Sequence, residues 1–299
     1  MQLHPAPLVP GDLIYICAPA KAIEEETVLF AKNWLEDKGY RVEVSPNCLG
    51  SHGYFSGTVY ERTADFQAGL DREDVKAILC ARGGYGSIQL MEHLQWAGFL
   101  REPKWIAGFS DITVFHQYLA LSEVPSIHST MPLNFEANTP ESLETLLAAW
   151  SGVSYEITAN GHDKNKEGEV EAEVIGGNLS ILYSLLGSKQ RPSYKGKILY
   201  IEDVGEQAYA IDRMLFAFKD AGIWDEVSGL IVGSFTSIGE TQNPTNLDYK
   251  TTLLEHFQFR NIPIAFDFRA GHQDDNCAIK LGTVACLKVT KNVTKLMFL

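Results

Sequence analysis

One segment of the sequence places a serine where a nucleophile is expected. Ser110 lies in Gly-Phe-Ser-Asp-Ile at residues 108–112, directly after an apolar run and before a helical pattern. This arrangement is typical of a nucleophile elbow, a sharp turn in which the amide after the serine faces a developing oxyanion. The motif is only half complete, because Ile112 stands where a second glycine is usual. The alternative is a serine that only caps the following helix.

Acid and histidine partners for this serine stand in the second half of the chain. Glu202 and Asp203 end an apolar run, and His272 lies in a polar loop at residues 270–276. Histidine suits proton transfer near neutral pH, and a carboxylate can fix its tautomer. Because neighbouring strand residues point to opposite faces, only one acid can face the imidazole, and we expect it to be Glu202. Glu206 has another explanation, since an acid is favoured near a helix start.

A glycine-rich loop, Arg-Gly-Gly-Tyr-Gly-Ser at residues 82–87, follows the apolar run 75–80. Its backbone amides would line a cleft at the carboxyl end of a strand. A dinucleotide site is not indicated, since Gln89 stands at the third glycine position, and no Lys-Ser/Thr pair makes the loop a P-loop. An oxyanion amide is the better functional interpretation, and an ordinary tight turn is the alternative.

Other candidate residues carry weaker signals. His272 with Asp274 and Asp275 could bind a metal, but no further residues with ligand spacing accompany them, so we expect no metal and no cofactor. Cys80 is more typical of a buried hydrophobe than of a nucleophile. His116 falls within a helical pattern, where a structural role is the default, whereas His128 follows a short apolar stretch and could line the cleft.

Composition and charge exclude several classes of partner. The 299 residues are 45% hydrophobic, enough for two domains, and 25 Lys and Arg against 38 Asp and Glu leave a net charge of −13. This charge repels nucleic acids and anionic membrane surfaces. No apolar run reaches the about 18 residues of a membrane span, and the first ten residues lack the positive region of a signal peptide. Five cysteines without a C-x-x-C pair favour a reducing compartment, so we expect a cytoplasmic protein.

Apolar runs alternate with helical patterns in the first half, which predicts βαβ units around a mainly parallel sheet. The expected strands are 13–17, 40–44, 75–80 and 104–109, and the expected helices are 23–38, 58–70, 87–94, 112–121 and 140–150. The second half offers strands at 169–175, 197–201, 230–232, 264–266 and 284–289, with helices near 179–186 and 208–221. The polar stretch 151–168 predicts a boundary between an α/β domain at 1–160 and a β-rich domain at 161–299. Residues 45–57 form a long loop of a kind that is often functional.

Five motifs taken together resemble the L,D-carboxypeptidase family, also called muramoyltetrapeptide carboxypeptidases. They are Ala-Arg-Gly-Gly-Tyr-Gly at 81–86, Gly-Phe-Ser-Asp-Ile-Thr at 108–113, Gly-Gly-Asn-Leu at 176–179, Glu202-Asp203 with Tyr-x-Ile-Asp-Arg-Met-Leu at 209–215, and Gly271-His272. The resemblance extends from about Gly11 to the last strand. It implies a triad of Ser110, Glu202 and His272 without a metal. It further implies a flavodoxin-like or class I glutamine amidotransferase-like N-terminal domain, a smaller β-rich C-terminal domain, a cleft between them, and a homodimer.

The same resemblance implies an activity. Members of this family remove the terminal D-alanine from the murein tetrapeptide L-Ala-D-Glu-diaminopimelate-D-Ala in cell-wall recycling, and related members cleave the antibiotic microcin C and confer self-immunity. We expect the first activity, through an acyl-enzyme on Ser110, with a muropeptide as partner. A non-catalytic protein that binds a small ligand is the alternative from another class.

The remaining expectations concern individual residues. The amides of Gly84 and Asp111 are expected to stabilise the oxyanion. Three residues are candidates for substrate binding, namely Arg82, Tyr85 and Asn178. The chain departs from the family pattern at Ser129-Thr130, where Gly-Pro is usual. The resemblance therefore does not assign a ligand contact to His128.

Overall fold

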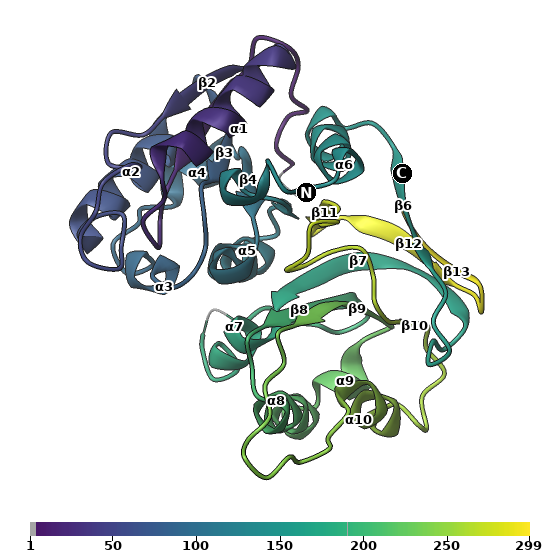
Figure 1. The fold of residues 1–299 in the computed structure, drawn as a ribbon. Coiled ribbons are helices and arrows are strands. Elements are labelled where there is room, and N and C mark those ends of the chain that lie inside the picture. Colours follow the sequence, from purple (N-terminus) through teal and green to yellow (C-terminus); the bar gives the residue numbers. More distant parts are fainter. Residues whose placement is uncertain (1–3, 190) are drawn as a thin grey trace.

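The computed structural model describes residues 4–189 and 191–299, which form two sheets with helices packed against them (Figure 1). The first sheet has the order β11-β5-β4-β3-β1-β2. Its strands from the first half of the chain are β1 (Leu13–Cys17), β2 (Arg41–Val44), β3 (Val75–Cys80), β4 (Trp105–Gly108) and β5 (Ser126–His128). These five strands are parallel, whereas β11 (Ile279–Leu281) joins β5 in the antiparallel direction.

Helices cover both faces of this sheet. All five residues of β1 are buried: Ile14 and Ile16 pack on one face, and the alternating residues pack on the other. Continuous apolar runs of this kind are typical of parallel strands buried on both sides. One face carries α1 (Glu25–Asp37) and α6 (Pro140–Ser151), and the other carries α2 (Val59–Asp71) and α5 (Thr113–Leu121). The short helices α3 (Ser87–Leu90) and α4 (Ala97–Arg101) follow β3.

The second sheet is mixed, with the order β10-β9-β8-β7-β12-β13-β6. Its parallel part consists of β7 (Gly168–Asn178), β8 (Ile198–Val204), β9 (Gly229–Thr236) and β10 (Ile264–Ala265). Its antiparallel part consists of β12 (Val284–Val289), β13 (Val293–Phe298) and β6 (Tyr155–Asn160). One face packs against α7 (Leu179–Ser184), α8 (Ala208–Asp220), α9 (Ile223–Glu226) and α10 (Tyr249–His256), and Figure 1 shows α8 and α10 below the sheet.

The other face of the second sheet points toward the first sheet. Tyr200 of β8 lies in the core on this face together with residues of β11, whereas Ile201 lies in the core under the helices. Among the described residues, no helix is both long and apolar enough to cross a membrane.

The predicted fold class, a parallel-sheet α/β unit followed by a β-rich unit, is confirmed. The structure adds elements that the pattern did not indicate: β5, β6, β11, β13, α4, α9 and α10. Strand β6 lies inside the stretch 151–168 that was expected to connect two domains, and it pairs with β13 at the chain end. Strand β11 returns from the second half into the first sheet. The boundary at residue 160 stays a prediction.

Candidate active site

Ser110 stands on a strained turn between β4 and α5. Its φ of 64° lies in the left-handed region, which residues other than glycine rarely adopt. Gly108 on the entry side has a φ of 154°, and a Cβ there would lie 3.0 Å from Ile112 and 3.2 Å from the Cβ of Cys80. The turn therefore needs glycine before the serine, and the Ile112 side chain packs over it.

Buried hydrogen bonds hold this turn. The carbonyl of Gly108 accepts from Nε2 of His116 at 2.8 Å and from the amide of Ser129 at 3.2 Å. Nδ1 of His116 accepts from the hydroxyl of Ser126 at 2.8 Å. Burial lowers the pKa of His116 to about 3, so its ring is neutral. His116 therefore has the structural role that was expected of it.

The three residues predicted as a triad lie in contact. Nε2 of His272 is 3.1 Å from Oγ of Ser110, and Nδ1 of His272 is 2.6 Å from Oε2 of Glu202. Glu202 is completely buried, while the His272 side chain keeps 18% of its surface exposed. Since Nδ1 donates to the carboxylate, Nε2 of the neutral ring can accept the serine proton. The arrangement can therefore activate a serine hydroxyl.

The acid and the histidine shift each other's pKa. Burial alone would raise the pKa of Glu202, but the charge and hydrogen bond of His272, together with the nearby His128, outweigh it and lower the value to about 2. Burial alone would lower the pKa of His272, but the charge and hydrogen bond of Glu202, helped by the charge of Asp203, raise it above its ordinary value of 6.5. The buried carboxylate is thus ionised across the neutral range and favours the imidazolium form of its partner.

A glycine brings the histidine onto its acid. Gly271 has a φ of 112°, and a Cβ there would lie 2.5 Å from Oγ of Ser234 and 2.9 Å from the Cβ of Glu202. Its amide donates to Oδ1 of Asn276 at 2.8 Å. A side chain at residue 271 would therefore have to displace these atoms or the loop that carries His272.

The neighbouring acids point elsewhere, as strand alternation predicts. Oδ2 of Asp203 accepts from the amide and hydroxyl of Ser180 at 2.9 and 2.7 Å, on the helix side of β8. Burial raises the pKa of Asp203 to about 6, with a further contribution from the charge of Glu202. Glu206 accepts from the hydroxyl of Ser180 at 3.0 Å. Among these acids, Glu202 is the one that contacts His272.

Asn178 was expected to bind substrate, and the structure gives its side chain structural partners. Nδ2 donates to Asp203 at 2.9 Å, and Oδ1 accepts from the amide of Ile181 at the start of α7. Its own amide donates to Oγ1 of Thr113 at 3.0 Å. Asn178 therefore ties β7, α5 and α7 together, and a contact with substrate stays a prediction.

The glycine-rich loop lies against the elbow. A Cβ on Gly83 would be 3.0 Å from the Cβ of Ser110 and 3.2 Å from the amide nitrogen of Asp111. Gly84 follows with a φ of 107°. The buried carboxylate of Asp111 accepts from the amide of Ser87 at 2.8 Å, which joins the loop to the turn. Gly83, the loop glycine that lies against the serine, was part of the predicted loop but was not singled out, because spacing does not show which glycine touches another segment.

Two predicted substrate residues lie in or beside this loop. Arg82 donates from Nη1 to the carbonyl of Ala22 at 2.9 Å. Tyr85 is half exposed, with its ring 6.2 Å from that of Phe55. The Tyr54 ring lies 5.4 Å from Phe55, and both residues belong to the long loop expected to be functional. The aromatic group of Tyr54, Phe55 and Tyr85 was not anticipated as a unit.

A metal site is not indicated. The described residues contain no group of three or more His, Cys, Asp or Glu that could hold an ion. Asp275, which was considered as a ligand beside His272, is paired with Arg269 at 2.5 Å.

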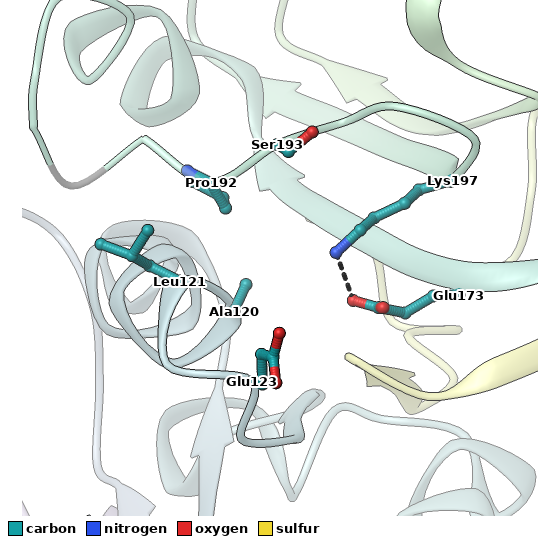
Figure 2. A pocket seen from close by; sticks show the side chains of 7 residues that line it. All are labelled: Ala120, Leu121, Glu123, Glu173, Pro192, Ser193 and Lys197. Carbon is teal, nitrogen blue, oxygen red and sulfur yellow. Dashed lines mark hydrogen bonds and ion pairs between the residues drawn. The ribbon is translucent and has the colours of Figure 1, made fainter. Parts of the chain in front are cut away.

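A separate pocket of about 410 Å³ lies at the end of α5 farthest from Ser110 (Figure 2). Lys197 and Glu173, from the second sheet and its flank, form an ion pair at 2.6 Å. Figure 2 shows this pair across the pocket from Ala120 and Glu123. None of these residues was predicted to be functional, and the predicted triad lies outside this pocket.

Comparison with known families gives two matches along the chain. Residues 14–129 match the model of the LD-carboxypeptidase N-terminal domain, and residues 171–287 match that of the LD-carboxypeptidase C-terminal domain. These matches confirm the resemblance found in the motifs.

Full-length relatives agree with these matches. The carboxypeptidase-like protein slr1534 of Synechocystis is 31% identical, over 95% of this chain and 93% of the relative. The murein tetrapeptide carboxypeptidase of Pseudomonas aeruginosa is 28% identical over 92% of each chain, and the microcin C7 self-immunity protein MccF of Escherichia coli is 27% identical over 94% and 93%. The crystal structure of muramoyltetrapeptide carboxypeptidase from Oxalobacter formigenes, 24% identical, superposes with a TM-score of 0.86 over 96% of this chain and 98% of that one.

The strain at Ser110 predicts an unusual order of stability. We expect Ser110→Gly to be more stable than Ser110→Ala by about 1 kcal/mol, because both lose the hydroxyl but only alanine keeps a Cβ in the left-handed region. Urea denaturation of the two variants measures the difference. At most positions a glycine variant is less stable than an alanine variant. If Ser110→Ala were at least as stable as Ser110→Gly, the turn would not be strained.

The pairing of His272 with Glu202 predicts a charge-dependent pKa. We expect NMR titration of the His272 ring to give a pKa above 6.5, and we expect Glu202→Gln to bring it below 6.5, since burial is the largest influence on the ring and only the charge of Asp203 then opposes it. Glu206→Gln is the control and is expected to leave the pKa unchanged. A His272 pKa that does not respond to Glu202→Gln would mean that the carboxylate does not stabilise the imidazolium.

Proposed function

This chain belongs to the LD-carboxypeptidase family, and we propose that it is a serine carboxypeptidase that releases the terminal D-alanine of the murein tetrapeptide. The observation that carries the proposal is the chain of contacts from Oγ of Ser110 through His272 to the buried Glu202, at 3.1 and 2.6 Å. The likeness to the murein tetrapeptide carboxypeptidase of Pseudomonas aeruginosa supports the choice of substrate.

Acylation begins at the serine. Ser110 attacks the carbonyl carbon of the diaminopimelate residue while its proton passes to Nε2 of His272. Glu202, ionised because its pKa is about 2, stabilises the imidazolium through Nδ1. When the C–N bond breaks, the imidazolium gives its proton to the leaving amine, so D-alanine departs and an ester on Ser110 remains.

Deacylation repeats the same steps with water. His272 takes a proton from the water molecule, whose oxygen attacks the ester carbonyl, and returns the proton to Oγ of Ser110 as the shortened peptide leaves. We assign the oxyanion contacts to the amides of Asp111 and Gly84. Each such donor contributes about 3 kcal/mol to lowering the barrier. The close approach of Gly83 to Ser110 and Asp111 supports this placement.

A peptidase of antibiotic adducts is the second candidate. The observation in its favour is the full-length likeness to the self-immunity protein MccF. Such an enzyme would use the same serine, histidine and acid, so the two candidates differ only in the groups that receive the rest of the substrate.

The proposal includes a cytoplasmic location, which the cysteine content favours, and a homodimer, which the family resemblance implies. The five cysteines are free thiols, four of them buried, which agrees with a reducing compartment. The proposal includes no cofactor.

The substrate assignment predicts a defined product. Incubation with purified murein tetrapeptide is expected to release free D-alanine and the tripeptide, detected by mass spectrometry. Ser110→Ala is expected to lower the rate by several orders of magnitude while the melting temperature stays close to that of wild type, because the covalent route is lost. A fluorophosphonate should label wild type and not this variant. Labelling without release of D-alanine would favour the antibiotic-adduct candidate, and a wild type that is not labelled would contradict serine catalysis.

The acid assignment predicts a large difference between two similar variants. Glu202→Gln is expected to lower kcat by about 10³ to 10⁴, as in other triads that lose the charge of their acid. Glu206→Gln makes the same chemical change four residues later and is expected to stay close to wild type. Steady-state kinetics on the tetrapeptide gives kcat for both variants. If Glu206→Gln were inactive and Glu202→Gln active, Glu206 and not Glu202 would be the acid that orients His272.

A further inference from the structure

A second histidine faces the buried acid from the side opposite His272. His128, the last residue of β5, is completely buried, and its Nε2 lies 4.0 Å from Oε1 of Glu202. Oε2 of the same carboxylate is the oxygen that contacts His272. Within the part of the chain that the structure describes, Oε1 of Glu202 and both ring nitrogens of His128 have no hydrogen-bond partner.

Other polar atoms around this contact are also buried and unpartnered among the described residues. They are the hydroxyls of Tyr200 and Ser234 and Nδ2 of Asn276. The ring of Tyr200 lies 4.8 Å from that of His128, and Ser234 and Asn276 flank Gly271. Buried polar groups in proteins are almost always hydrogen-bonded. This concentration of unpartnered polar atoms behind one carboxylate is therefore unusual for a protein interior, and it surrounds Glu202.

The position of His128 follows from the sheet that carries the nucleophile. In the pairing of β4 with β5, His128 is the partner of Gly108, the glycine that enters the elbow. The next residue, Ser129, donates its amide to the carbonyl of Gly108. Alternation along β8 sends Tyr200 and Glu202 to the face that meets this edge. The pairing of β4 with β5 thus positions Ser110 and also brings His128 to Glu202.

Among the residues that the structure describes, the remaining neighbours of His128 offer its ring no closer anionic partner. The ring of His116 lies 6.4 Å away and is neutral, and the ring of Phe109 lies 5.8 Å away. Glu202 is the anion that contacts His128 among the described residues. An approach of about 1 Å would turn the contact into a hydrogen bond, and hydrogen bonds in active sites without substrate are often long.

We propose that His128 is a positioning residue that holds Oε1 of Glu202 through Nε2, so that Oε2 stays directed at His272. The terminal torsion of a glutamate side chain is broad, so a carboxylate held at one oxygen can rotate. A donor at the second oxygen fixes the plane of the carboxylate while the imidazolium forms and decays. This inference rests on the proposed serine mechanism and adds a residue to it.

The experiment measures the rate at which a fluorophosphonate labels Ser110 in His128→Leu and His128→Gln. We expect His128→Leu to label about 10- to 100-fold more slowly than wild type, by analogy with the loss that follows removal of the outer hydrogen-bond partner of a metal-binding histidine. We expect His128→Gln to label within about fivefold of wild type, because the amide nitrogen of glutamine can reach the position of Nε2. His256→Leu is the control. It removes another histidine, on α10, whose ring nitrogens have no hydrogen-bond partner among the described residues, and we expect this variant to be labelled at the wild-type rate.

A double-mutant comparison separates positioning from a general structural effect. If His128 acts through the carboxylate, His128→Leu should have less than a twofold further effect in the Glu202→Gln background. An equal loss in both backgrounds would overturn the proposal, as would a folded His128→Leu that labels at the wild-type rate. A wild type that is not labelled at all would instead contradict the proposed function.

A third variant covers the case in which His128→Leu does not fold. His128→Asn keeps a polar side chain but is too short to reach Oε1, so we expect it to label as slowly as predicted for the leucine variant, whereas His128→Gln stays fast. A melting temperature is measured for each variant. Asparagine and glutamine variants that are both folded and label equally fast would overturn the proposal.

Discussion

The burial of one negative charge constrains the rest of the site. Glu202 has no exposed surface, yet its pKa is about 2, so it is ionised at every pH at which the protein is expected to work. An isolated carboxylate in a protein interior is very unfavourable, and the cost becomes small only when charged or hydrogen-bonding partners surround it. His272 is such a partner at 2.6 Å. The same contact leaves Nε2 of His272 free to face Ser110.

The two sheets must therefore keep a fixed position relative to each other, because Ser110 follows a strand of the first sheet and Glu202 lies on a strand of the second. Helix α5, which follows the nucleophile, packs on β7, where Gln117 donates to the carbonyl of Gly176 at 3.1 Å. A Cβ on Gly177 would lie 2.5 Å from Oγ1 of Thr113, so only glycine permits this approach. Because β7 pairs with β8, the strand of Glu202, these contacts connect the acid to the elbow through rigid elements. Sites held by regular elements are positioned more accurately than sites held by loops.

Much of the first sheet could be predicted, because its signal is local. Strands β1 and β3 have the predicted bounds, since each is a short, continuous apolar run between polar turns. Strand β6 escaped prediction because the polar stretch around it hides its alternation of buried and exposed residues. Strand β11 has only three residues, and it is a strand because Ile279 pairs with His128, far away in the sequence. Pairing between distant segments leaves no local pattern.

For the site, the sequence by itself determined the residue types and their surroundings: a serine on a turn that requires glycine, a histidine beside another glycine, and Glu202 on the opposite face of its strand from Asp203. Only the tertiary structure decided that these groups touch, that the side chain of Asn178 is used for support, and that His128 faces the second oxygen of Glu202. The physical reason is that Ser110 and His272 are 162 residues apart and meet only when the two sheets pack. The pKa values of the buried pair likewise depend on exclusion of water, which the same packing produces.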